Sequence, residues 1–182
     1  EENEPSVTEK NPDTNPEADT FVEKTVTLKN DVIKLLFTND GGGIKEASLL
    51  KHFVYSPNTA KEKGLDESPL IVLNSGIKNP IGALSTGRGS FKDLKYQIID
   101  QNENQVVLRA LTDEKLEVTK TFSLTNSDAL GGGYVVKMNI SLRYAADAGN
   151  MNLNNYYVFA GASSQLSEGN SSDLYTGLEY LY

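Results

Sequence analysis

Two stretches in the second half of the chain alternate between apolar and polar residues with a period of two. In "LEVTKTFSL" (116–124), one face carries Leu, Val, Lys, Phe and Leu, and the other carries Glu, Thr, Thr and Ser. In "YVVKMNISLRY" (134–144), Val136, Met138, Ile140 and Leu142 form the apolar row. This period is that of a β-strand with one face on a core and one in water. It predicts antiparallel sheets, and helical periodicity is scarce in the chain.

Short strand-like segments continue along the chain from Phe21 onward. Apolar segments of about 5 to 9 residues are separated by Asn, Asp, Gly and Ser, which is typical of a sandwich or barrel with little helix. We expect a hairpin turn at 100–104, a meander over about 94–144, and a polar excursion at 56–68 with room for a short helical turn. The expected strands are 23–29, 32–38, 44–51, 70–74, 94–100, 105–111, 116–124, 134–144, 156–160 and 174–180.

The first twenty residues differ from the rest. They hold three prolines, seven acids and one aliphatic side chain larger than Ala, Val7, so they bury too little apolar area to offset the entropy of ordering. We predict a disordered acidic linker over 1–20 and one β-sandwich domain over 21–182. The sequence starts without Met and stops at "GLEYLY", so we expect a fragment of a longer protein, with a domain that the C-terminal end could truncate.

Charge and composition remove several classes of function. Residues 1–20 hold seven of the 25 acids and one of the 17 bases, which leaves 18 acids and 16 bases in the remainder. Such a balance lacks the basic surface that nucleic acid binding needs. With no Cys, disulfides, thiolate metal sites and a Cys nucleophile are excluded. No run approaches the ~18 apolar residues of a membrane span and no signal peptide is visible, so we expect a soluble chain.

"FTNDGGGIKEASLLKHF" (37–53) contains three consecutive glycines and is the first candidate for chemistry. A phosphate loop needs Lys followed by Ser or Thr, whereas Lys45 is followed by Glu46. We therefore predict that the glycines let the chain reverse between the first two strands of the sandwich. The second triplet (131–133) and "STGRGSF" (85–91) are read as loops. Arg88 in the latter could pair with an anion, although a solvated turn is favoured.

His52, the single histidine, lacks a nameable catalytic partner. No G-x-S-x-G elbow accompanies it, and neither metal-ligand spacing nor an EF-hand pattern is present. Two carboxylates distant in sequence could still meet for glycosidic chemistry, but nothing nominates a pair. The aromatic runs "NNYYVF" and "YTGLEYLY" could line a groove, with packing favoured. We therefore name no catalytic, cofactor-binding or metal-binding residue, expect no enzyme and no cofactor, and leave the partner-binding residues unknown.

Taken in order, these segments resemble the periplasmic domain of the YidC membrane insertase family (YidC/Oxa/Alb). An acidic stretch precedes a strand pair with a Gly-Gly bend and an I-x-x-x-x-L-x-x-[YF] run, whose aromatic is displaced by one position here. A V-x-K-x-[FY]-x-[LF] strand and a Y-x-[VI]-x-[VM]-x-[IV] strand follow. The match covers roughly 23–160. The matching residues are Gly42, Gly43, Ile44, Leu49, His52 and Phe53, then Val118, Lys120, Phe122 and Leu124, then Tyr134, Val136, Met138 and Ile140.

The resemblance implies an antiparallel β-supersandwich, galactose mutarotase-like, on the periplasmic side of the bacterial inner membrane. It implies a non-catalytic interaction or scaffold module of a membrane-embedded parent that inserts and folds inner-membrane proteins. The implied partners are nascent membrane proteins and the Sec translocon with SecD and SecF. The alternative is a carbohydrate-binding or mutarotase-like domain of the envelope. Sites of that type use two histidines and a glutamate, which a chain with one His cannot supply.

Overall fold

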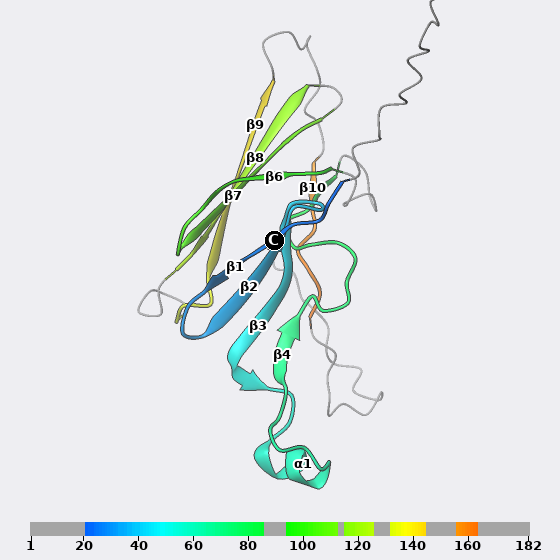
Figure 1. The fold of residues 1–182 in the computed structure, drawn as a ribbon, viewed down its shortest axis with the longest axis vertical. Helices are drawn as coiled ribbons and strands as arrows, with labels where there is room; N and C mark the ends of the chain where they lie inside the picture. The colour runs from blue at the N-terminus through cyan, green and yellow to red at the C-terminus, as the bar shows by residue number, and fades with distance from the viewer. Residues whose placement is uncertain (1–20, 86–93, 113–114, 126–131, 145–155, 164–182) are drawn as a thin grey trace, which may run out of the picture.

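The computed structural model describes residues 21–85, 94–112, 115–125, 132–144 and 156–163. Over these residues the chain forms two four-stranded antiparallel sheets, a two-stranded sheet and one short helix. Figure 1 shows the two larger sheets as neighbouring layers, with the helix at the far end of the first sheet. The predicted all-β antiparallel architecture with little helix is confirmed.

The first sheet has the order β1-β2-β3-β4. Its strands are β1 (Thr25–Lys29), β2 (Ile33–Thr38), β3 (Gly43–Phe53) and β4 (Leu70–Leu73). Helix α1 (Pro57–Glu62) lies in the polar excursion between β3 and β4. It begins there because Ser56 caps it, accepting a hydrogen bond from the Thr59 amide at 3.2 Å, and because Pro57 supplies a preformed first turn.

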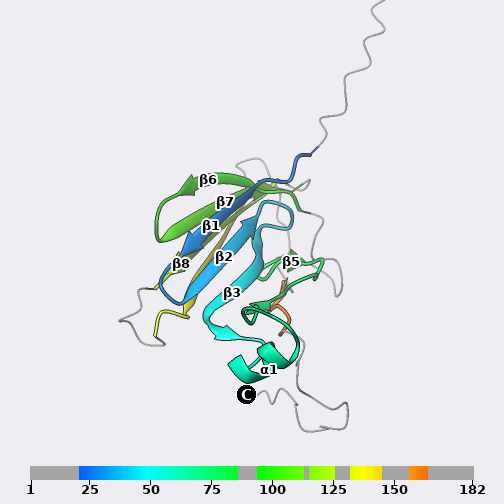
Figure 2. The ribbon, with the colours of Figure 1, turned by 60° about the horizontal axis from the view of Figure 1, so that its bottom comes forward.

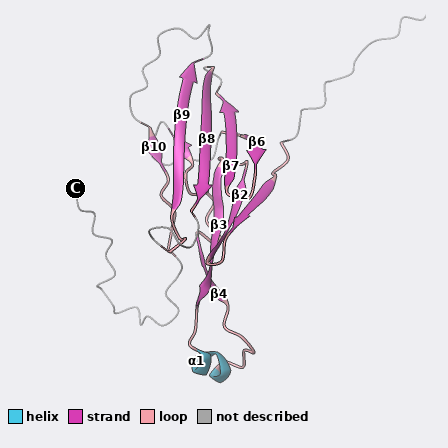
Figure 3. Cartoon of the chain, turned by 90° about the vertical axis from the view of Figure 1, so that its left-hand side faces the viewer, coloured by secondary structure: helices cyan, strands magenta, loops and turns pink. Residues whose placement is uncertain are grey.

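The second sheet is the predicted meander, with the order β6-β7-β8-β9. Its strands are β6 (Gln97–Gln101), β7 (Gln105–Leu111), β8 (Leu116–Leu124) and β9 (Val136–Tyr144). The expected hairpin joins β6 to β7, where the Asn102 side chain accepts a hydrogen bond from the Asn104 amide at 3.0 Å. β7, β8 and β9 run side by side in Figure 3.

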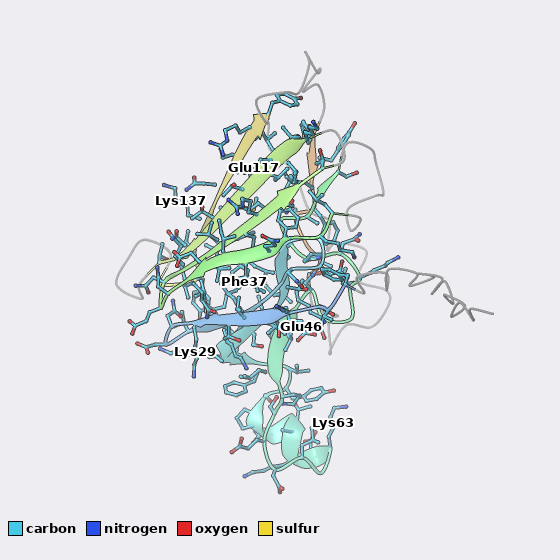
Figure 4. All side chains as sticks on the ribbon, turned by 45° about the horizontal axis from the view of Figure 1, so that its top comes forward. Lys29, Phe37, Glu46, Lys63, Glu117 and Lys137 are labelled. Atoms are coloured by element: carbon cyan, nitrogen blue, oxygen red, sulfur yellow. The ribbon has the colours of Figure 1, made fainter. Side chains whose placement is uncertain are left out.

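The core lies between these two sheets. In Figure 4 Phe37 of β2 points into the space between them, and its ring meets that of Phe122 of β8 edge to face, with centroids 5.1 Å apart. Inward residues of β8 are buried and outward ones are half-exposed along its whole length, as the alternation predicts. Burial of the two apolar rows against each other is therefore what stabilises the sandwich.

Asn30 links the two sheets at one end of the sandwich. Its side-chain carbonyl accepts hydrogen bonds from the Val32 and Ile33 amides, both at 2.9 Å. Its amide nitrogen donates to the carbonyls of Thr125 at 3.0 Å and Gly133 at 2.7 Å. One side chain thus fixes the β1–β2 turn against the segment that joins β8 to β9.

β5 (Leu84–Ser85) and β10 (Tyr157–Val158) form a two-stranded sheet, and Figure 2 shows β5 beside β3 of the first sheet. β5 was not predicted because two residues carry no periodicity. Several expected strands extend beyond the observed ones, two of them by three residues. The segment 94–96 makes a single bridge, Asp40 with Lys95, before β6 begins, and the strand expected at 156–160 pairs over only two residues.

The glycine bend joins β2 to β3, which are the second and third strands. The expectation that it joins the first two is wrong because Thr25–Lys29 already forms a strand that pairs with β2. The predicted linker 1–20 and the strand expected at 174–180 lie outside the described residues, and the domain boundary at residue 20 stays a prediction. No helix in the described part of the chain has the length and apolar character needed to cross a membrane.

Candidate functional site

The glycine bend is built around backbone carbonyls that point inward. Gly41 and Gly42 have φ of 77° and 61°, a left-handed backbone that residues with a side chain rarely adopt. β3 then begins at Gly43, which pairs with Thr38. A side chain at Gly42 would meet the Tyr96 ring, since an added Cβ would lie 2.3 Å from Cδ2. Gly42 is therefore needed both for its left-handed backbone conformation and because the Tyr96 ring leaves no space for a side chain.

Lys120 fills the inside of this bend. Its side chain is fully buried, and Nζ donates to the carbonyl oxygens of Gly41 at 3.1 Å, Gly42 at 2.7 Å and Gly82 at 2.8 Å. Nζ also lies 4.3 Å from the centroid of the Tyr96 ring. Three carbonyl acceptors match the three N–H groups of an ammonium.

Burial lowers the pKa of Lys120 to about 7 because the charged form loses its hydration. A buried amine with a lowered pKa can serve as a nucleophile or base, so Lys120 is the first residue to weigh as catalytic. Its Nζ, however, is surrounded by its own backbone acceptors and an aromatic face, which leaves no approach for a substrate. Lys120 instead has a structural role, since its hydrogen bonds hold the glycine bend against β8.

His52 pairs with Tyr134 on the surface. Its Nε2 lies 3.1 Å from the Tyr134 hydroxyl, and the two rings are 5.6 Å apart between centroids. The contact connects β3 of one sheet to Tyr134, two residues before β9 of the other. No carboxylate in the described ranges contacts His52, so the geometry here offers a sheet-to-sheet contact and not the oriented base of a catalytic triad.

A hollow of about 500 Å³ opens on the outer face of the second sheet, near the point where β6 begins. It is formed where three adjacent strands bring polar side chains together. Gln97 of β6 stands opposite Arg109 of β7, and Leu111 of β7 stands opposite Glu117 of β8. The lining residues are Lys95, Gln97, Arg109, Ala110, Leu111 and Glu117.

The charged groups of the hollow differ in their partners. The Lys95 ammonium contacts the Asp40 carboxylate at 2.5 Å, and Glu117 accepts from Arg143 at 2.8 Å. Arg109 makes no ion pair or hydrogen bond within the described residues. Leu111 beside it is 61% exposed. The hollow therefore presents an unpaired guanidinium next to an exposed aliphatic side chain.

The second notable surface is the free side of β9, which we call the β9 edge. β9 pairs with β8 over nine consecutive residues without a bulge, and no described residue bonds to the backbone on its other side. Its inward apolar residues are half-buried, whereas those of β8 are buried. Long, regular edges that expose apolar residues are sites where another strand adds to a sheet.

In the sequence, Lys120 is notable only as a lysine in the apolar row of an alternating strand. The structure shows its role, because the side chain is buried against the glycine bend. The hollow carried no sequence signal, since its residues come from separate strands that only pairing brings together. Arg88 and Gly131 lie outside the described residues, whereas Gly132 and Gly133 both have positive φ, as a loop requires.

Together, the fold and these surfaces define an antiparallel β-sandwich module whose polar groups lie on an open sheet face and whose apolar row continues to a free edge. The YidC periplasmic domain family model matches residues 25–181. The chain belongs to this family, and the resemblance read from the sequence is confirmed. Membership places it at the bacterial inner membrane, on the periplasmic side.

Curated relatives carry the name "Membrane protein insertase YidC". One, from Saccharophagus degradans, is 27% identical over 124 residues, which cover 60% of this chain and 21% of that protein. Those from Aeromonas hydrophila and Aeromonas salmonicida are 32% identical over 121 residues, covering 62% of the chain and 22% of each protein. The chain thus spans about a fifth of the length of these relatives. No solved structure is significantly similar to it.

Proposed function

We propose that this chain is a non-catalytic interaction module of a membrane protein insertase, which helps to insert and fold inner-membrane proteins with or without the Sec translocon. The observation that carries the proposal is the family match over 25–181. The sealed environment of Lys120 and the tyrosine partner of His52 support the non-catalytic part, because neither residue is arranged to act on a substrate.

The β9 edge is the surface we assign to partners. Strand addition supplies main-chain hydrogen bonds without demanding a particular sequence, which suits a module that meets many nascent chains. Its inward row, with Met138 and Ile140 half-buried, extends the core to the edge and offers apolar contact to each alternate residue of an added strand. The outward residues, such as Asn139 and Lys137, are exposed and stay in water beside an added strand.

Site-specific photocrosslinking in cells tests the proposal on the parent protein. A benzophenone amino acid replaces Asn139 on β9 in one variant, and Lys34, exposed on the central strand β2 of the other sheet, in the control. We expect adducts with SecD, SecF or nascent inner-membrane proteins at position 139 and few at position 34. Equal adducts at both positions, or none at 139, would contradict the assignment of the β9 edge.

Carbohydrate binding is the second candidate. It is favoured by the outer face of β8 and β9, where Thr119, Thr121, Asn139 and Ser141 offer hydroxyl and amide groups in adjacent pairs. Calorimetric titration of the chain with simple sugars and short glycans distinguishes the candidates. Heat that saturates with one of them supports binding, and no heat across the panel removes this candidate.

A further inference from the structure

We infer that the hollow on the outer face of the second sheet binds a carboxylate of an extended peptide, namely a Glu or Asp side chain next to an aliphatic residue. The inference is independent of the β9 edge, since residues of β6, β7 and β8 and the segment before β6 line the hollow and β9 contributes none.

The charge pattern selects a single carboxylate. Lys95 and Glu117 are neutralised by Asp40 and Arg143, so Arg109 is the unpaired cation of the lining in the part of the chain that the structure describes. A guanidinium presents its N–H groups as a planar fork that matches both oxygens of a carboxylate. The side chain of Gln97, which stands opposite Arg109 across β6 and β7, adds a further donor.

Exposed apolar groups favour an aliphatic residue beside the carboxylate. Leu111 of the lining is 61% exposed, and Phe21, which is outside the lining but whose ring lies 4.6 Å from the Lys95 ammonium, is 42% exposed. A neighbouring Leu, Ile or Val of a peptide would cover this surface and remove it from water. A volume of about 500 Å³ holds two side chains of that size and falls within the range of small-molecule pockets.

A membrane surface fits the hollow less well. Attraction to anionic lipid depends on several basic residues acting together, whereas this lining offers one unpaired cation beside the carboxylate of Glu117. The same carboxylate opposes polyanions such as nucleic acid. A peptide with one acid and one aliphatic residue meets the pattern without placing a second negative charge near Glu117.

Nuclear magnetic resonance on the full 182-residue chain tests the inference. The probe is the short peptide acetyl-Gly-Ser-Glu-Leu-Ser-Gly-amide, compared with the same peptide carrying Gln in place of Glu. We expect the Glu peptide to shift the side-chain signals of Arg109 and Gln97 and to bind about five- to tenfold more tightly than the Gln peptide, because only the former makes a charge-assisted pair.

Two variants separate the hollow from general charge. Arg109→Gln should abolish the preference for the Glu peptide. Lys137→Gln on the same face should keep it within about twofold, since Lys137 is exposed opposite Ser123 and does not line the hollow. Circular dichroism verifies that both variants fold. Equal binding of the two peptides, or an unchanged preference in Arg109→Gln, overturns the inference. Arg109-dependent binding to phosphatidylglycerol vesicles that the Glu peptide does not displace overturns it too, in favour of a lipid headgroup.

Discussion

Replacing Gly42 with Ala tests the account of the glycine bend most directly. Gly42 has φ of 61°, and an added Cβ would lie 2.3 to 2.5 Å from three atoms of the Tyr96 ring, well inside van der Waals contact. Tyr96 is buried, its amide donates to the Asn39 carbonyl at 2.9 Å, and its ring covers Lys120. The ring therefore has no free direction in which to move.

The expected cost has two parts. A residue with a side chain in the left-handed region costs about 1–2 kcal/mol, and forcing a buried ring out of place costs about 1–3 kcal/mol. Gly42→Ala should thus lower the free energy of unfolding by about 2–5 kcal/mol. Gly64→Ala is the matched control, because Gly64 has φ of 71° but nothing within 4 Å of an added Cβ, so only the first part applies.

Urea denaturation followed by far-ultraviolet circular dichroism measures both variants, since the chain has no Trp. The difference between them isolates the steric part, about 1–3 kcal/mol. Adding Tyr96→Leu to Gly42→Ala should recover part of that difference, as coupled neighbours do. If Gly42→Ala lowers the free energy of unfolding no more than Gly64→Ala does, the close approach of the bend to the Tyr96 ring does not contribute to stability and our account is refuted.

Three further predictions use the same denaturation assay. Burial lowers the pKa of Lys120 from 10.5 to about 7 in the folded chain. Between these two pH values Lys120 therefore holds a proton in the unfolded chain and has lost it in the folded chain. Stability should therefore rise between pH 7 and 10, by at most about 1.4 kcal/mol per pH unit, and the rise should be missing in Lys120→Met. The Tyr96 hydroxyl is buried without a hydrogen-bond partner among the described residues, so Tyr96→Phe should leave stability unchanged or raise it by up to about 1 kcal/mol; a clear loss would indicate a hidden partner. Asn30→Ala should lower the free energy of unfolding by about 1–3 kcal/mol, because it breaks four hydrogen bonds at a sheet-to-sheet contact. Asn102→Ala in the exposed hairpin should lower it less. Equal losses in the two variants would contradict the linking role of Asn30.

The sequence predicted the elements whose signal is local. The meander β6 to β9 and its hairpin were found because alternation and turn residues are properties of neighbouring positions. β10 is shorter than expected and β5 was missed, because their pairing depends on backbone contacts made elsewhere in the fold. Gly82 is an example: its amide donates to the Phe159 carbonyl at 2.8 Å, a bond between segments 77 residues apart that leaves no local pattern.

The candidate surfaces could not be predicted for a related reason. Whether Arg109 is paired depends on which residues stand opposite and diagonal to it, and register sets this. Arg143 and Arg109 look alike in the sequence, each following an apolar residue in a strand. Only the paired strands show that Arg143 lies opposite Glu117 and is neutralised, whereas Arg109 lies opposite Thr119 and is not.

Strand β8 shows why stability and partner binding can be varied separately in this domain. Successive side chains leave a strand on opposite faces, so Lys120 enters the core and locks the glycine bend while Thr119 and Thr121 stand on the outer face. A change at 120 should alter unfolding without touching the hollow, and a change at Arg109 should alter ligand preference without reaching the core, since its side chain is exposed. Variants of the inward row of β8 that lose stability therefore report on folding, and only outward or edge variants that keep full stability test the proposed binding surfaces.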